Sequence, residues 1–143
     1  YTVDVSIQPG WNTFETYFAE IDGLSTRVDQ KLEDHDITYD AVGRVETAYA
    51  ELYNVFGDVN LDMLDEVTVD IFPPGKPTSR LEAAYLNPVP DDALTRLQLI
   101  PSLANFKQFF NNETFGMRVG MRPRELPGKE VQCRLEIRMA FLE

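Results

Sequence analysis

The chain has 143 residues, of which 43% are hydrophobic and 26% are charged, a composition typical of one soluble globular domain and unlike that of a disordered chain. Its 24 acidic and 13 basic residues give a formal charge of −11, which disfavours binding to nucleic acid because phosphate contacts dominate that affinity. No run approaches the roughly 18 apolar residues of a membrane helix. A single cysteine, Cys133, excludes an intrachain disulfide and a CxxC metal pair.

The first predicted element is a strand. In YTVDVSIQPG, apolar and polar residues alternate from Tyr1 to Ile7, and Pro9-Gly10 closes the segment. The segment STRVDQKLEDHD has helical spacing instead, because Val28 and Leu32 lie one turn apart, with Ser25 as the predicted N-cap. The segments TFETYFAEI and AVGRVETAYAELYNVF fit a helix and a strand equally well.

The second half of the chain contains clearer strands. DEVTVDIF predicts a strand with Val67, Val69 and Ile71 facing inward, ended by the prolines that follow it. LTRLQLI predicts another with Leu97 and Leu99 buried, and LANFKQFF predicts a short helical turn or a loop.

The last two segments alternate most regularly, from Phe115 to Met121 and from Val131 to Phe141. PRELPGK between them supplies a turn, so we expect an antiparallel hairpin with one apolar and one basic face. Gly116 and Gly120 in the first of these strands are expected to relieve crowding or to allow a close backbone approach. Residues 1–143 are therefore predicted to form one mainly β domain, an antiparallel two-sheet sandwich of Greek-key or jelly-roll type with one or two short helices.

From about Val28 to Leu142, six segments follow one another in a recognisable order: VDQKLEDHDI, YDAVGRVETAYAELYN, LDMLDEVTVDIF, LTRLQLIPSLANFKQFF, ETFGMRVGMR and EVQCRLEIRMAFLE. This succession resembles a group of small, uncharacterised bacterial envelope lipoproteins with a β-sandwich body. The resemblance implies that residues 45–53 form a strand, and it implies export and tethering to the envelope with no known activity. The sequence departs from the group because no cysteine near Tyr1 can carry a lipid. The start at Tyr1, without Met or a signal peptide, suggests a trimmed product.

The stretch GDVNLDMLDE places Asp58, Asn60 and Asp62 at the first ligand positions of an EF-hand. Met63 and Val69 stand where that motif needs glycine and a bidentate carboxylate, so the stretch is interpreted as a polar loop leading into the following strand. These three residues remain the candidate metal ligands. A looser calcium site, assembled from several acidic loops, is the alternative.

A basic face is the sharpest local feature of the sequence, and it consists of Arg118, Arg122, Arg134 and Arg138. One interpretation is a docking surface for an acidic partner or an anionic glycan. The favoured interpretation is that these arginines pair across strands with Glu136 and with acids from neighbouring strands. Cys133 is predicted to be a small buried hydrophobe, and His35 to lie exposed at a helix end.

The sequence favours a non-enzymatic, envelope-associated β-sandwich with a structural or protein-interaction role. Its partner would be an unknown protein or envelope component, and it would meet the membrane only through an N-terminal lipid anchor absent from this chain. The alternative is a small ligand-binding module for calcium or carbohydrate, motivated by the acidic loops and by Trp11, Tyr17 and Phe18. No other cofactor is expected. A hydrolase would need His35 to meet a hydroxyl, or several carboxylates to converge, in a deep pocket.

Overall fold

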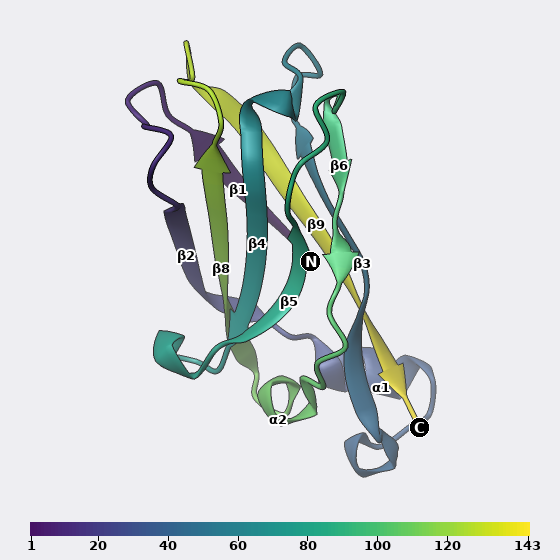
Figure 1. The fold of residues 1–143 in the computed structure, drawn as a ribbon. Helices are drawn as coiled ribbons and strands as arrows, with labels where there is room; N and C mark the ends of the chain where they lie inside the picture. The colour runs from purple at the N-terminus through teal and green to yellow at the C-terminus, as the bar shows by residue number, and fades with distance from the viewer.

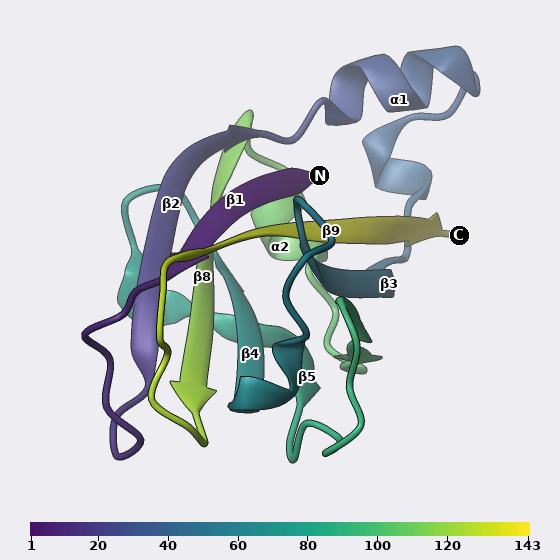
Figure 2. The same ribbon diagram turned by 90° about the horizontal axis from the view of Figure 1, so that it is seen from above.

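The computed structural model describes all 143 residues as two antiparallel sheets packed against each other (Figure 1). The four-stranded sheet has the order β1 (Thr2–Ile7), β9 (Val131–Leu142), β3 (Arg44–Asn54) and β6 (Arg96–Gln98). The five-stranded sheet has the order β2 (Tyr17–Ser25), β8 (Thr114–Pro123), β4 (Leu64–Phe72), β5 (Leu81–Leu86) and β7 (Ile100–Pro101). Figure 2 shows β9 crossing β8 and β4 at a wide angle. The predicted two-sheet β-sandwich is confirmed.

The core lies between the sheets and contains 30 buried residues in one cluster. Val67, Val69 and Ile71 of β4 are fully buried, as their alternation predicted. Leu97 and Leu99 are buried as predicted too, with 3% and 2% of their surface exposed. Both ambiguous segments are strands. Residues 45–53 lie within β3, where pairing to β9 on one side and β6 on the other satisfies the backbone, and Tyr17 begins β2.

Two short helices cover the end of the sandwich at which β2 and β9 finish: α1 (Val28–Asp34) and α2 (Lys107–Phe110) (Figure 1). Three turns of 3-10 helix complete the structure, η1 (Tyr39–Ala41), η2 (Leu61–Met63) and η3 (Pro77–Ser79). The predicted helix is confirmed as α1, in which Val28 and Leu32 are buried, but the N-cap prediction is wrong. Ser25 pairs with Thr114 as the last residue of β2, and α1 begins after Arg27 instead. Neither helix is long and apolar enough to span a membrane.

The predicted hairpin between the last two strands is also wrong. β8 belongs to the five-stranded sheet and β9 to the four-stranded sheet, so residues 124–130 carry the chain from one sheet to the other. The alternation of the two strands is satisfied in either arrangement, because both apolar faces meet the same core from opposite sides. Consecutive strands pair directly only at β4 and β5.

Candidate functional site: the loop end of the sandwich

Four connections at one end of the sandwich bring together distant parts of the chain. They are residues 8–16 between β1 and β2, 55–63 between β3 and β4, 87–95 between β5 and β6, and 124–130 between β8 and β9. Figure 1 shows all four at the top of the molecule, at the end opposite to α1 and α2. We call this surface the loop end.

Each of the four connections exposes most of the surface of a large apolar side chain. Phe14, Phe56, Leu94 and Leu126 are 89%, 74%, 66% and 73% exposed, in that order along the chain. Only one other large apolar side chain is exposed to a similar degree, Leu103 at 89%, and it lies in the connection before α2. Single exposed apolar residues are ordinary, but four at one end concentrate apolar surface of the kind used for binding.

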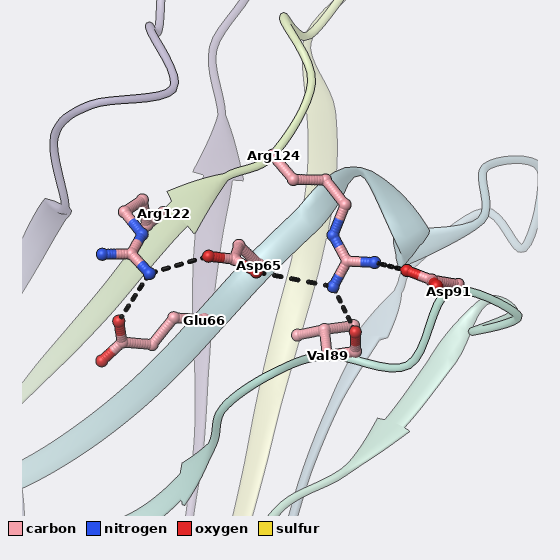
Figure 3. A network of polar contacts seen from close by, with 6 residues as sticks. All are labelled: Asp65, Glu66, Val89, Asp91, Arg122 and Arg124. Carbon is pink, nitrogen blue, oxygen red and sulfur yellow. Dashed lines mark hydrogen bonds and ion pairs between the residues drawn. The ribbon is translucent and has the colours of Figure 1, made fainter.

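Arg124 fastens two of these connections to β4, as Figure 3 shows. Its guanidinium donates to the carbonyl oxygen of Val89 and to the carboxylate of Asp91, both in the connection between β5 and β6. Asp65 of β4 lies between two arginines, with its carboxylate 2.7 Å from Nη2 of Arg122 and 3.7 Å from Nη2 of Arg124. This partly buried network fixes the positions of the connections, because each of these three charged groups has more than one partner.

Asn54, at the end of β3, anchors the connection that carries Phe56. Its side chain is 4% exposed, and its Nδ2 donates to the carbonyl oxygen of Gln132 at 3.1 Å. Its Oδ1 accepts hydrogen bonds from the backbone N–H groups of Asp58 at 2.9 Å and Val59 at 3.3 Å. One buried amide therefore joins the base of the loop to β9 and sets the path of its first residues.

The connection between β1 and β2 is braced within itself. The Oδ1 of Asn12 accepts hydrogen bonds from the N–H groups of Phe14 and Glu15 at 2.9 and 3.0 Å, which forms a tight polar turn. The rings of Trp11 and Tyr17 stack with their centroids 4.4 Å apart, and the N–H of Asn12 donates to the Tyr17 hydroxyl. Phe14 is therefore held on an ordered turn.

The loop end is also acidic. Its four connections contain seven carboxylates and two cationic side chains, a formal charge of −5. Both cations are engaged, Arg124 with Asp65 and Asp91, and Lys129 with Asp58 at 3.7 Å. The surface therefore offers apolar side chains surrounded by uncompensated negative charge.

The candidate metal ligands lie in this surface without forming a metal site. Asp58 is paired with Lys129, Asn60 is exposed before η2, and Asp62 lies in the first turn of η2. No group of three or more His, Cys, Asp or Glu side chains is close enough anywhere in the chain to hold a metal ion. The stretch is a loop and a short turn that lead into β4, as the sequence predicted.

The predicted single basic face does not exist, because its arginines lie on two different sheets. Arg118 and Arg122 belong to β8, whereas Arg134 and Arg138 belong to β9. All four lie within 4.0 Å of a carboxylate. Three pair across strands, as the favoured interpretation predicted: Arg118 with Glu20, Arg122 with Asp65 and Glu66, and Arg134 with Asp4. Arg138 pairs instead with Glu136 of its own strand. Exposed pairs of this kind contribute about 0 to 1 kcal/mol each.

The other candidate residues are dispersed. His35 is exposed after α1, and the pocket that it lines contains no hydroxyl or carboxylate. Trp11 and Tyr17 are half-buried, with Trp11 packed against the core, whereas Phe18 lies on the outer face of β2 with the guanidinium of Arg118 3.5 Å from its ring centroid. The three aromatic residues therefore do not form one platform.

Cys133 is fully buried in β9, as predicted, and its burial raises the pKa of the thiol from 9.0 to about 12. We expect a thiol reagent at neutral pH to label it only as fast as the protein unfolds. Because the pKa of this thiol is higher in the folded state, the protonated thiol contributes its full share of the folding stability below pH 9. This contribution is lost as the pH rises toward 12.

Raising the pH from 8 to 10 should therefore lower the free energy of unfolding by about 1.4 kcal/mol through this thiol alone. Denaturant titrations at both pH values measure the change. The Cys133→Ala variant should lack this part of the pH dependence, and an equal loss in both proteins would contradict the assignment.

Comparison of the chain with protein-family models, with curated protein sequences and with solved structures finds no match.

Proposed function

We propose that this protein is a non-enzymatic, envelope-associated β-sandwich that binds a protein partner through its loop end. One observation carries the binding role: each of the four connections at that end exposes a large apolar side chain. Arg124 and Asn54 brace the connections beneath, so docking would lose little loop entropy. The envelope location rests on the resemblance of the sequence, and fractionation of the native cells would test it.

Charge selects the kind of partner. With a formal charge of −5, the loop end would repel an anionic lipid surface and a second copy of itself. A partner that carries lysine or arginine around an apolar patch would match both the apolar tips and the acidic surround. We therefore commit to a basic protein segment as the occupant.

Replacing Phe56 by serine is expected to weaken this binding by about ten- to a hundredfold, because full burial of one large apolar side chain contributes about 1.5 to 3 kcal/mol. The fold should be unaffected within about 0.5 kcal/mol, since the ring is largely exposed. The measurement starts by panning a random-peptide display library on the wild-type protein. The Kd of each enriched peptide is then measured for the wild-type protein and for the Phe56→Ser variant.

The enriched peptides should combine basic with apolar residues. Leu103→Ser is the matched control, because Leu103 is as exposed as Phe14 but lies outside the loop end, and it should leave the Kd unchanged. Peptides without basic residues, or equal effects of the two substitutions, would refute the proposal. Binding of the wild-type protein to phosphatidylglycerol vesicles would refute it too, because the apolar tips would then serve a membrane.

A further inference from the structure

The helical end of the sandwich contains cations that have no acidic partner. Nine of the 13 lysine and arginine side chains lie within 4.0 Å of a carboxylate. The four that do not are Arg27, Lys31, Lys76 and Lys107. In a chain with 24 carboxylates, an unpaired cation is the exception. Arg27, the residue before α1, and Lys31, within α1, also lie one helical turn apart.

Arg27 and Lys31 line one pocket of about 320 Å³ where β1, β2 and α1 meet. The remaining lining residues are Tyr1, Thr2, Leu24 and Ser25. The lining contains two cations and three hydroxyl groups but no carboxylate. The pocket thus offers hydrogen-bond donors and positive charge, which are what an oxyanion requires.

The two cations are not neutralised by their surroundings. The ammonium of Lys31 lies 4.6 Å from the centroid of the Tyr1 ring rather than on a carboxylate. Burial, followed by the nearby charge of Arg27, lowers the pKa of Lys31. Glu136, on the neighbouring strand β9, is held by Arg138 at 3.0 Å. Asp29 and Glu113 line the adjoining pocket, which shares Ser25 and Arg27 with this one.

The backbone at Arg27 is strained and firmly held. Its φ of 53° lies in the left-handed region, which is costly for any residue except glycine. The preceding Thr26 is fixed to the segment that leads into β8. Its backbone N–H donates a hydrogen bond to the carbonyl oxygen of Glu113 at 2.9 Å, and its hydroxyl donates one to the carbonyl oxygen of Asn112 at 2.9 Å. The Tyr1 hydroxyl donates to the Thr26 carbonyl oxygen. The backbone N–H of Lys31 donates to the carbonyl oxygen of Arg27. Strain that is maintained by such bonds is typical of residues with a binding role.

We propose that this pocket binds a small tetrahedral oxyanion, a phosphate or sulfate group, through the guanidinium of Arg27 and the ammonium of Lys31. Arg27 supplies the planar fork that matches two oxygens of such a group, Lys31 supplies a point charge, and Thr2 and Ser25 supply hydroxyl donors. A free ion and an oxyanion on a saccharide would present the same chemistry to the pocket. This site is separate from the loop end and does not depend on the function proposed there.

The test is calorimetric titration of the whole protein with sodium phosphate, sodium sulfate and a sulfated disaccharide at low ionic strength, with sodium acetate for comparison. We expect saturable binding of the tetrahedral anions that weakens as salt is added. A sulfated disaccharide that binds more tightly than sulfate would identify the saccharide as the source, and equal affinities would identify the free ion. Absence of saturable binding by any of these anions overturns the proposal.

Two variants and one control locate the site. Arg27→Gly removes the guanidinium and relieves the positive φ, so the melting temperature should stay the same or rise while anion affinity falls at least about tenfold. Lys31→Gln should lower the anion affinity by a similar factor. Lys76→Gln removes an unpaired cation that lines no pocket, and it should bind as the wild type does. Equal weakening in the Lys76 variant would show diffuse attraction and would overturn the proposal.

Discussion

Gly116→Ala is expected to lower the free energy of unfolding by about 3 kcal/mol, the upper part of the range for overpacking. Gly116 lies on the outer face of β8 and is paired with Phe72 of β4. A Cβ atom at position 116 would overlap three atoms of the Phe72 ring, far inside van der Waals contact. The ring is 1% exposed, so either this buried ring or the strand must move to admit the Cβ atom.

Denaturant titration followed by circular dichroism would measure the loss. Gly128→Ala is the matched control, because a Cβ atom added there would have no atom within 4 Å and the φ of Gly128 is not in the left-handed region. That variant should differ from the wild type by less than about 0.5 kcal/mol. Truncating the ring in a Phe72→Ala background should remove most of the cost of Gly116→Ala. Equal stabilities of the two glycine variants would disprove the close approach.

Asn54→Ala is expected to cost about 2 to 3 kcal/mol, because it leaves the backbone N–H groups of Asp58 and Val59 without their acceptor and removes one of the two donors to the Gln132 carbonyl, which keeps the Val55 N–H. Asn54→Asp retains the acceptor but loses the donor to the Gln132 carbonyl. It should therefore be destabilised as well. Only an amide in this position satisfies all three groups.

Amide hydrogen exchange gives the local readout. In Asn54→Ala, the N–H groups of Asp58 and Val59 should exchange faster than the rest of the protein, since their acceptor is gone. Asn60→Ala is the control in the same loop, because Asn60 is exposed and its side chain makes no hydrogen bond within the protein. Unchanged exchange in the Asn54 variant would show that the loop is held by other contacts. The affinity of loop-end peptides for that variant would then also stay unchanged.

The strands were predictable because each has one buried face. From Val131 to Ile137, for example, every second side chain is buried, and this alternation is visible without a structure. Which strand pairs with which was not predictable from the same pattern. β8 and β9 would have the same inward residues whether they lay side by side in one sheet or faced each other across the core.

The loop end was missed for a related reason. Phe56 and Leu126 stand as single apolar residues among polar residues and glycine, so no periodicity marks them. Phe56 and Leu126 share one surface only because their connections meet at the same end of the sandwich. Recognising this requires the arrangement of the strands, which the sequence pattern does not provide. Asn54 carried one usable signal: it ends β3 at a position where the alternation calls for an apolar side chain, so a polar residue there requires partners.

The position of β9 has a consequence for how the chain folds during synthesis. β9 lies between β1 and β3 in the four-stranded sheet, although it is made more than a hundred residues after β1. Until it emerges, β1 has no strand to pair with, and β3 has an unpaired edge. Such pairings between distant residues fold slowly, because loop closure costs entropy before any contact is gained. The four-stranded sheet therefore cannot be completed until translation has passed β9, whereas all strands of the five-stranded sheet have been made by Pro123.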